Sequence, residues 1–384
     1  MHHRHQYDAL RHRCQVFFSY FYNRHKNIPE FFLRYIILDL TSEMGKRTSL
    51  MFRFYILDKY IREIDFLITR KEKITMKPRR SVLSVPGHVE KMHAKACQSN
   101  ADVIMLDLED SVPVVAKPDA PAIIIKSIKS LDWKNKTLSV RINGLDTPFG
   151  YRDLKAIGEK VGHRIDTVVL PKTDAVGDVH FVSRMLDGIE MHKGFSNRIG
   201  IETIVESARG LANVNRIARA SDRLKTLVFG IADYSASIGA RLVSISGHGE
   251  EEDVYPGHRW HFEMSRLVMA ARAQNLMVID APYGNFKDSV GLERACAMTC
   301  ALGFDGKWAI HPNQLETINR VFSPSEKDVD RAMKVLAAYE TAKIDGRGAA
   351  AVNGRMIDGA TVRLARQVKA QAEYLGMIKA SGEK

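Results

Sequence analysis

The sequence is poor in cysteine, and the few cysteines that it has are not arranged to bind a metal or one another. The four, Cys14, Cys97, Cys296 and Cys300, form no Cys-x-x-Cys pair and have no histidines at matching spacing. This pattern indicates neither a zinc site nor a disulfide framework. A reducing cytoplasm is the compartment that fits it best.

Long apolar runs are also missing. An apolar patch such as residues 31–38 is interrupted by Arg34 and is too short to span a bilayer. No stretch shows the basic, apolar and small-residue regions of a secretory signal peptide. We therefore expect no association with a membrane.

The positive charge of the chain is not concentrated in a nucleic-acid-binding motif. The formal net charge is +12, and residues 1–75 hold 14 Lys and Arg against 8 Asp and Glu, so they carry half of the excess. The remainder is ordinary for a domain that binds phosphorylated or carboxylated metabolites. No aromatic and basic motif of the RNA-binding type is present. We expect small-molecule ligands and no nucleic acid.

Residues 1–75 differ from the rest of the chain in composition. They contain 14 of the 31 aromatic residues but a single glycine, Gly45, and a single proline, Pro29, and they show no sustained apolar period. Met76, by contrast, leads directly into a strand pattern. We expect the functional protein to begin near Met76, with 1–75 an extension such as a mis-called start. An organelle-targeting peptide is the rival interpretation, and the eight acidic residues argue against it.

From residue 80 onward, short apolar runs alternate with segments whose apolar residues recur at three and four, a pattern that favours parallel α/β structure. Eight such runs are explained best by a closed (β/α)8 TIM barrel, and the glycine fingerprint of a doubly wound sheet is absent. We predict a barrel over residues 76–322 and a C-terminal helical lid extension over 323–384. The expected strands are 81–85, 103–108, 138–142, 167–170, 198–205, 226–229, 277–279 and 308–310.

Polar side chains follow these runs, where a barrel carries its chemistry. Glu206 and Asp233, 27 positions apart, end two neighbouring runs. Two such carboxylates can hold one hard divalent cation and leave positions free for water and substrate, so Mg²⁺ is the natural candidate, with Mn²⁺ as the second choice. A strand-end acid that caps the next helix is the alternative. The other strand-end residues are His88, Glu109, Asp110, Arg141, Asn143, Lys172, Asp280 and His311.

A long polar segment, residues 239–259, follows the sixth expected strand. In a barrel it would lie on the site side, and loops of this length are often functional. Its histidines match no zinc spacing.

Taken together, the strand-end motifs resemble those of the HpcH/HpaI aldolase/citrate lyase β-subunit family of CoA-ester lyases. They run in the expected order from residue 80 to about residue 375, and residues before Met76 lie outside the resemblance. The matching segments are 80–87 (RSVLSVPG), 107–112 (DLEDSV), 139–144 (SVRING), 170–172 (LPK), 205–210 (VESARG), 230–233 (GIAD), 307–312 (KWAIHP) and 354–358 (GRMID).

Within that family, residues 143–149 and 257–261 are most similar to malyl-CoA, β-methylmalyl-CoA and citramalyl-CoA lyases. The resemblance implies a Mg²⁺-dependent barrel whose substrate is a CoA thioester. It implies reversible carbon–carbon cleavage to a 2-oxo acid, glyoxylate or pyruvate, and acetyl-CoA or propionyl-CoA. It also implies a homo-oligomer, a trimer or hexamer, in which the lid of one subunit covers the site of the next.

The resemblance also implies roles for individual residues. Glu206 and Asp233 match the metal ligands, and Arg141 matches an arginine that would stabilise the enolate left on the acyl-CoA fragment. Asp358 matches a tail carboxylate used for proton transfer. From the local sequence alone, a surface salt bridge for Arg141 and a helix N-cap or turn for Asp358 are the alternatives.

Other residues are expected to support the site or bind the substrate. Glu109, Asp110, Glu202 and His311 are assigned supporting positions, and Glu202 is interpreted as a buried partner of a basic side chain. Lys172 either binds the substrate carboxylate or pairs with Glu202 or Glu109.

Arg80 and His88 are expected near the mouth of the barrel, where they would contact the CoA arm. Simple surface roles are the alternative for both residues.

Three other functions compete with a CoA-ester lyase. The protein could hydrolyse the thioester, or it could serve as the β-subunit of a citrate lyase complex that acts on an acyl-carrier thioester; the long 239–259 loop argues against the second. A basic scaffold attached through residues 1–75 is the non-enzymatic alternative. Retention of the expected polar positions argues against a scaffold, and deletion of 1–75 would test it.

Overall fold

The computed structural model describes residues 77–134, 136–240, 259–344, 350–352 and 355–379. All of them belong to one compact unit, Lys73–Lys384. The predicted extension 1–75 lies outside the described residues, and so does most of the predicted 239–259 loop.

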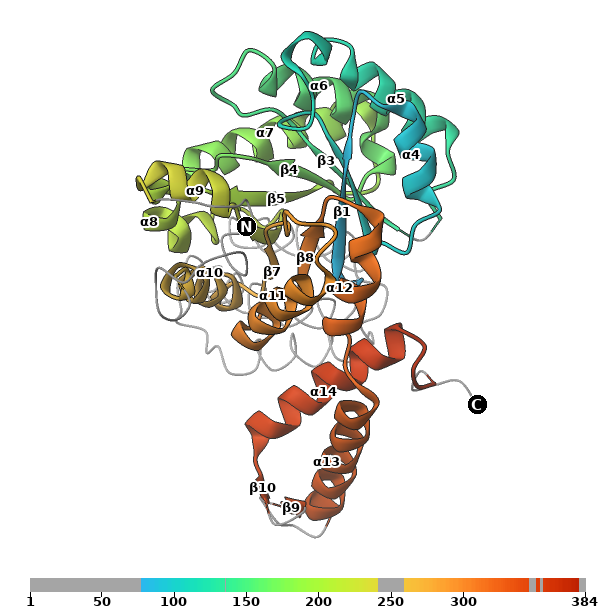
Figure 1. Cartoon of the computed structure of the whole chain (residues 1–384), viewed down its shortest axis with the longest axis vertical. Helices are drawn as coiled ribbons and strands as arrows, with labels where there is room; N and C mark the ends of the chain where they lie inside the picture. Colours follow the sequence, from blue (N-terminus) through green and yellow to red (C-terminus); the bar gives the residue numbers. More distant parts are fainter. Residues whose placement is uncertain (1–76, 135, 241–258, 345–349, 353–354, 380–384) are drawn as a thin grey trace, which may run out of the picture. The chain divides into compact units, whose positions relative to one another are not determined.

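Eight parallel strands close into a barrel, each paired with the next in the chain and the last paired with the first (Figure 1). This confirms the predicted (β/α)8 architecture, and every observed strand begins and ends within two residues of an expected run. The strands are β1 (Ser81–Pro86), β2 (Val103–Asp107), β3 (Thr137–Arg141), β4 (Thr167–Leu170), β5 (Gly200–Val205), β6 (Leu224–Phe229), β7 (Met277–Asp280) and β8 (Gly306–Ala309).

Helices follow the strands and surround the barrel, as right-handed parallel crossovers require. The α-helices are α4 (Glu90–Cys97), α5 (Ala120–Ser130), α6 (Gly150–Val161), α7 (Val176–Lys193), α8 (Ala208–Ile217), α9 (Ile231–Ser237), α10 (His261–Ala273), α11 (Ser289–Leu302) and α12 (Leu315–Val321). Short 3₁₀ turns are η2 (Val114–Ala116), η3 (Gly162–Arg164) and η4 (Pro312–Gln314).

Two apolar layers hold the barrel together because side chains alternate between the two faces of each strand. One layer fills the space between the strands and the helices. The other fills the barrel interior and consists of Val82, Val103, Met105, Val169, Ile204, Val228, Ile279 and Trp308. The interior is therefore a packed core, so chemistry is confined to its ends.

The C-terminal part is a helical hairpin with a small core of its own. Helix α13 (Glu326–Ile344) and helix α14 (Gly359–Tyr374) are joined through the antiparallel strands β9 (Ala350–Val352) and β10 (Arg355–Ile357). Ala332, Val335, Ile357, Val362 and Ala365 form the core of this hairpin. The helices agree with the pattern predicted after residue 322.

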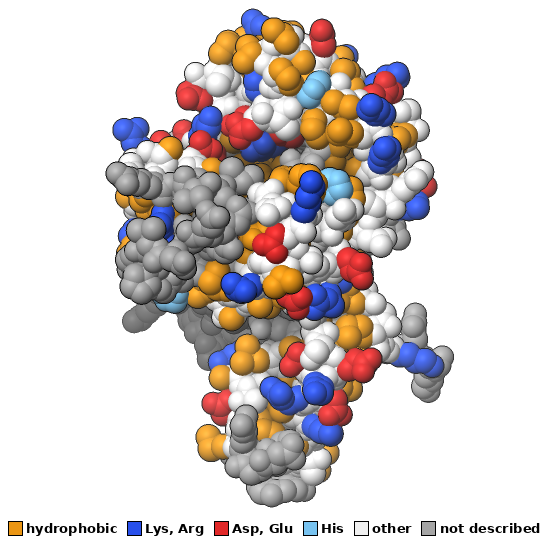
Figure 2. All heavy atoms as spheres, viewed as in Figure 1, with side chains coloured by type: hydrophobic (Ala, Val, Ile, Leu, Met, Phe, Trp, Pro, Cys, Tyr) orange, Lys and Arg blue, Asp and Glu red, His pale blue; other side chains and the backbone are white. Residues whose placement is uncertain are grey.

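No helix among the described residues is long and apolar enough to cross a membrane. On the face shown in Figure 2, Lys and Arg side chains are interspersed with Asp and Glu rather than gathered into one basic area. That face of the described residues thus lacks the continuous basic stripe typical of nucleic-acid-binding surfaces.

Candidate active site

Asp107 and Arg141 form a buried ion pair at the carboxyl end of the barrel. They are the last residues of the adjacent strands β2 and β3 and lie directly opposite each other in the register. Arg141 Nε lies 2.6 Å from Asp107 Oδ1, and Arg141 Nη2 lies 2.7 Å from Asp107 Oδ2. Two parallel charge-assisted bonds fix the orientation of the guanidinium as well as its position.

Glu109 lies two residues beyond Asp107 and next to two cations. Its Oε2 is 2.9 Å from Arg141 Nη1, and its Oε1 is 3.4 Å from Lys172 Nζ. Both carboxylate oxygens are buried, yet in the part of the chain that the structure describes no N–H points at either of them at an angle that makes a hydrogen bond. Burial raises the pKa of Glu109 to about 7, against the attraction of Arg141 and Lys172. Glu109 is thus a buried carboxylate with unused acceptor capacity.

Glu206 directly follows β5 and accepts one hydrogen bond from the residues that the structure describes. The backbone N–H of Lys172 donates to Glu206 Oε1 over 2.6 Å. Lys172 adopts φ = 49°, a left-handed conformation that costs energy in a residue with a side chain and is typical of functional turns. Burial, and then the charges of Glu109 and Asp233, raise the pKa of the Glu206 carboxyl.

The turn after β6 packs tightly against Glu206. A Cβ atom on Gly230 would lie 2.4 Å from Glu206 Cβ and 2.6 Å from Glu206 Oε2, so only glycine lets the two strand ends approach this closely. Asp233 follows three residues later, exposed in the first turn of α9. The predicted pair of carboxylates therefore comes from adjacent strand ends, although Asp233 is carried by the helix after its strand.

These acids fit a hard divalent cation. Glu109, Glu206 and Asp233 carry like charges close enough to raise the pKa of Glu206, and among the described residues the Glu109 oxygens accept no well-aligned hydrogen bond. A cation beside them would offset the repulsion. The described residues contain no group of three or more His, Cys, Asp or Glu side chains placed to hold a metal. Two protein carboxylates are the usual number for Mg²⁺, which keeps waters and substrate oxygens.

Trp308 of β8 completes the surroundings of Arg141. The guanidinium carbon lies 5.4 Å from the centre of a Trp308 ring, within the range of a cation–π contact. The indole N–H of Trp308 is buried, and no described residue accepts a hydrogen bond from it. Arg141 is thus held by Asp107 on one edge, Glu109 on another and Trp308 across its face.

Glu202 lies on the same face of β5 as Glu206 but deeper in the barrel, and the expectation of a buried basic partner is confirmed. Arg79 Nη1 donates to Glu202 Oε1 over 2.5 Å. Ser139 Oγ, at 2.9 Å, and Thr167 Oγ1 donate to the same oxygen. The partner is Arg79, so of the two pairings predicted for Lys172 the structure has the one with Glu109.

The expected position of Arg80 is wrong. Arg80 precedes β1 and therefore lies at the amino end of the barrel, opposite the strand ends that carry Glu206 and Arg141. Its Nε and Nη2 bind the two oxygens of Asp102 at 2.8 and 2.7 Å, and its Nη1 donates to Ser323 Oγ. The motif places a basic residue next to the first strand, but it does not indicate at which end of the barrel the side chain lies.

His88, Asp110 and His311 lie at the carboxyl end, as predicted. The ring Nδ1 of His88 is buried and has no hydrogen-bond partner within the described ranges, and Asp110 Oδ2 lies 3.3 Å from Arg141 Nη1. His311 stacks on Phe286 with ring centres 4.8 Å apart and caps η4. The roles assigned to these three residues stay predictions.

Asp358 is the N-cap of α14, which was the local alternative for this residue. Its side chain is exposed and accepts hydrogen bonds from Thr361 N at 2.8 Å and Thr361 Oγ1 at 2.9 Å. No hydrogen bond or ion pair of the described residues joins it to Arg141 or Glu206. Its proposed catalytic role stays a prediction.

Two strand-end acids have surroundings that the sequence did not suggest. From the sequence, Asp107 is only the first residue of the 107–112 motif and has no assigned partner. Its spacing of two from Glu109 is nevertheless that of side chains on the same face of a strand. Asp280 is one of the predicted strand-end residues, and it forms a fully buried ion pair with Lys307 of the adjacent strand. The charges of Lys307 and Asp280 both act on the buried thiol of Cys296 in α11, so this pair belongs to the layer between strands and helices.

Lys117, which was not predicted, braces the loops after β2 and β3. Its Nζ donates to the carbonyl oxygens of Leu108 and Glu109 at 3.1 and 2.7 Å and to Asn143 Oδ1 at 2.5 Å. Asn143 is in turn held by Asp153. The chain segments that carry Glu109 and Arg141 are therefore tied to each other.

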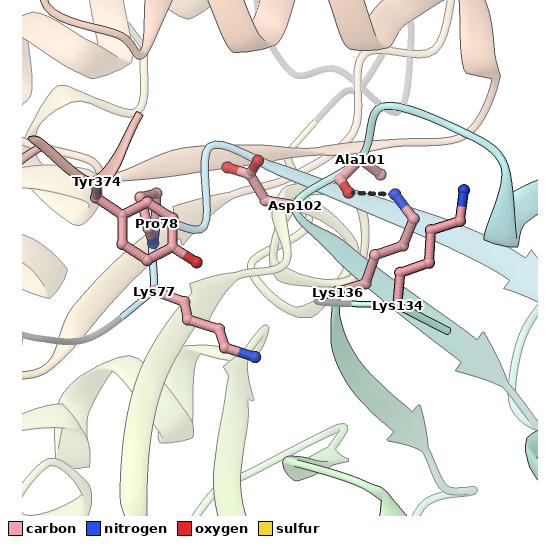
Figure 3. A pocket seen from close by; sticks show the side chains of 7 residues that line it. All are labelled: Lys77, Pro78, Ala101, Asp102, Lys134, Lys136 and Tyr374. Atoms are coloured by element: carbon pink, nitrogen blue, oxygen red, sulfur yellow. Dashed lines mark hydrogen bonds between the residues drawn. The ribbon is translucent and has the colours of Figure 1, made fainter. Parts of the chain in front are cut away.

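A cavity of about 320 Å³ lies away from this site, beside the start of β1. It is lined by Lys77, Pro78, Ala101, Asp102, Lys134, Lys136 and Tyr374 (Figure 3). Lys136 Nζ donates to the carbonyl oxygens of Ser99 and Ala101, and Asp102 is held by Arg80. The charges in this cavity are largely used by the protein itself, so we do not place the chemistry there.

Comparison with known proteins supports the family resemblance. The family model described as HpcH/HpaI aldolase/citrate lyase matches residues 80–312. A Cereibacter sphaeroides protein named L-malyl-CoA/beta-methylmalyl-CoA lyase is 41% identical over 307 residues, which span 78% of this chain and 96% of that protein. The citrate lyase subunit beta of Leuconostoc mesenteroides is 33% identical over 308 residues, 79% of this chain and 96% of that protein.

A solved structure gives the same fold. The crystal structure of CitE from Mycobacterium tuberculosis, in complex with magnesium, acetoacetate and coenzyme A, has a TM-score of 0.62 and 28% sequence identity. The match covers 78% of this chain and 99% of that one.

Proposed function

The chain belongs to the HpcH/HpaI aldolase/citrate lyase family, and from this premise we propose that it is a Mg²⁺-dependent carbon–carbon lyase that acts on a CoA ester. The substrate we propose is malyl-CoA or β-methylmalyl-CoA, split reversibly into glyoxylate and acetyl-CoA or propionyl-CoA. Citramalyl-CoA, which would release pyruvate, is the related candidate. The observation that supports the proposal is the group of charges at the strand ends of this barrel: Arg141 pairs with Glu109, and Glu109 and Asp233 lie close enough to Glu206 to raise its pKa.

Glu206 and Asp233 would hold the metal ion. When bound, Mg²⁺ would supply a Lewis acid that chelates the carboxylate and hydroxyl of the α-hydroxy-acid end and lowers the pKa of that hydroxyl. Glu109 would orient water beside this site, because its two buried oxygens form ion pairs with Arg141 and Lys172 but no well-aligned hydrogen bond with the residues that the structure describes. Lys172 would hold the turn through its backbone N–H and pair with Glu109 through its side chain.

Arg141 would carry the charge that cleavage creates. The hydroxyl would give its proton to the water that Glu109 orients, its carbon would become the carbonyl of glyoxylate, and the electrons of the broken C–C bond would pass to the thioester as an enolate. A guanidinium fixed by Asp107 offers a positive charge that needs no reorganisation as the enolate forms. A proton then reaches the enolate carbon and completes the acyl-CoA product.

Asp358 is our candidate for that proton donor, delivered by the C-terminal hairpin of a neighbouring subunit in a homo-oligomer. Its exposure, and its lack of a hydrogen bond to this barrel's site residues, support a role outside its own subunit. We propose that residues 76–322 form the catalytic barrel and 323–384 the shared lid, with 1–75 a dispensable extension. The described cysteines are free thiols, which supports a cytoplasmic location.

An assay that follows 2-oxo acid and CoA ester together tests the proposal. Full-length protein and protein begun at Met76 are given Mg²⁺ with malyl-CoA, β-methylmalyl-CoA or citramalyl-CoA in turn. Equal release of both products, lost on addition of a chelator, is the expected result. Release of free CoA without 2-oxo acid would identify a thioesterase instead. No release of product from any of the three substrates would contradict the proposed substrate class.

A further inference from the structure

The least exposed charged side chain of the site is Asp107, which binds Arg141 but is not among the residues proposed to touch the metal or the substrate. We infer that Asp107 is a positioning residue, which sets the orientation of the Arg141 guanidinium so that one nitrogen, Nη1, faces the reacting groups. This inference rests on the proposed lyase function for its kinetic test. Its structural test is independent of that function.

Asp107 receives hydrogen bonds from both sides of its carboxylate. Oδ1 accepts from Arg141 Nε at 2.6 Å and from the backbone N–H of Glu109 at 2.9 Å. Oδ2 accepts from Arg141 Nη2 at 2.7 Å and from the N–H and hydroxyl of Ser111 at 3.0 and 2.5 Å. A carboxylate held by so many donors cannot rotate freely, so the arginine that it binds is fixed too.

The direction of Arg141 follows from which nitrogens Asp107 occupies. Nε and Nη2 are bound to Asp107, which leaves Nη1 as the nitrogen that points away from it. Nη1 lies 2.9 Å from Glu109 Oε2 and 3.3 Å from Asp110 Oδ2. The free edge of the guanidinium is therefore turned toward the acids that surround the proposed metal position.

Asp107 has no direct access to a substrate. It is fully buried, and its acceptor positions are used by Arg141, Glu109 and Ser111. Arg141 retains a small exposed fraction, 6%. Any influence of Asp107 on the reaction must therefore pass through the residues that it holds.

Orientation is the property that such a residue controls. A guanidinium stabilises an enolate oxygen only when an N–H is aimed at the position where the charge develops, and misplacement by about 1 Å can cost about 10²-fold in rate. Loss of the two hydrogen bonds to Asp107 would leave Arg141 paired with Glu109 through Nη1 alone, so the guanidinium could rotate. The expected signature is a lower kcat with little change in KM, because the lost interaction is made mainly in the transition state.

Asp280 provides a matched control. Like Asp107, it is the last residue of a strand, it is fully buried, and it forms an ion pair with a cation on the next strand, Lys307. Its pair lies between the strands and the helices, away from Arg141. Asp280→Asn should lower the melting temperature but leave kcat per folded molecule unchanged.

A double-mutant cycle in the Mg²⁺-loaded full chain, with malyl-CoA as the probe, separates positioning from general destabilisation. Asp107→Asn should lower kcat about 10²-fold, and Ser111→Ala, which removes one donor to Oδ2, should lower it by a smaller factor. In the Arg141→Gln background, Asp107→Asn should cause no further loss, because it acts through Arg141. Additive losses, or a kcat of Asp107→Asn equal to that of Asp280→Asn, would overturn the inference.

Crystal structures of wild type and Asp107→Asn keep the inference testable even if malyl-CoA is not cleaved. We expect the Arg141 guanidinium to leave its wild-type orientation in the variant while the barrel stays closed. An unmoved guanidinium would overturn the positioning role whatever the substrate is. An inactive wild type with a displaced Arg141 in the variant would instead contradict the proposed function and leave the positioning role intact.

Discussion

Glu202 and Glu206 lie four residues apart on the inner face of β5, and their surroundings differ. Glu202, near the amino end, is bound by Arg79, Ser139 and Thr167. Glu206, at the carboxyl end, accepts a single backbone hydrogen bond and has two other carboxylates as neighbours. Both are almost completely buried. One carboxylate is neutralised by the protein, whereas the other is left with excess negative charge.

This difference distinguishes a buried carboxylate that stabilises the fold from one that is placed to bind a ligand. A buried carboxylate with an ion-pair partner and full hydrogen bonding stabilises one packing of the core, and removal of one partner is costly. A buried carboxylate among like charges destabilises the fold unless a ligand supplies the missing positive charge. The comparison predicts opposite outcomes for the same substitution at the two positions.

The largest effect is expected for Glu206→Gln. Glutamine keeps an acceptor for the Lys172 N–H but removes one of three neighbouring negative charges, so the fold should be as stable as wild type or more stable. Activity should fall by more than about 10²-fold because a metal ligand is lost. Steady-state kinetics and thermal unfolding of the same preparation check both parts. Normal kcat, or a clear loss of stability, would contradict the distinction.

Glu202→Gln should show the reverse behaviour. The guanidinium of Arg79 would remain buried without a charged partner, so the free energy of unfolding should fall by about 3 kcal/mol. Activity per folded molecule should stay close to wild type, since Glu202 is bound by Arg79, Ser139 and Thr167 near the amino end of the barrel. Urea unfolding and an active-site titration measure the two quantities. A large loss of kcat with unchanged stability would mean that Glu202 belongs to the site.

Gly230→Ala, in the turn after β6, tests how strongly Mg²⁺ binding depends on the position of the Glu206 carboxylate. The added methyl group would lie 2.4 Å from Glu206 Cβ, so the carboxylate must move. We expect metal affinity and kcat/KM to fall about tenfold, a smaller effect than removal of the ligand. Mg²⁺ titration by calorimetry measures the affinity. Gly177→Ala, at a helix position with open space around it, is the control and should bind Mg²⁺ normally.

The smallest effect on stability and activity is expected for a substitution of Arg80, which lies at the amino end of the barrel. Arg80→Ala breaks the pair with Asp102 and should cost about 1 kcal/mol of stability, because the pair is partly exposed. The KM for the CoA ester should not change, since Arg80 lies at the opposite end from Glu206. A several-fold rise in KM with normal stability would restore Arg80 as a CoA contact.

The strands and the grouping of site residues could be predicted because each depends on a local pattern. Apolar runs of four to eight residues specify strands, and a run that ends in a polar residue places that residue at the carboxyl end of a parallel barrel. Glu206, Arg141 and Lys172 were located in this way. The spacing of four residues between Glu202 and Glu206 placed both on one face of the strand, with Glu202 deeper in the barrel. A buried basic partner for Glu202 could be predicted from that position.

The residues that the sequence did not resolve depend on partners far away in the chain. Whether Asp107 meets Arg141 depends on the register between β2 and β3, and Asp280 meets Lys307 because both lie on the outer faces of adjacent strands, next to the inward-pointing Ile279 and Trp308. Arg80 was misplaced because a basic residue beside a strand carries no signal for the end at which it acts. The left-handed turn at Lys172 is likewise set by its bond to Glu206 rather than by its own preference.

Thermal unfolding in the presence and absence of Mg²⁺ tests the central claim most directly, because it needs no substrate. A ligand that binds only the folded state stabilises it by about 2.7 kcal/mol at 100 times its Kd. Mg²⁺ should therefore raise the melting temperature of wild type and of Glu202→Gln, and should leave that of Glu206→Gln unchanged. A full Mg²⁺ shift in Glu206→Gln, or none in wild type, would contradict the account.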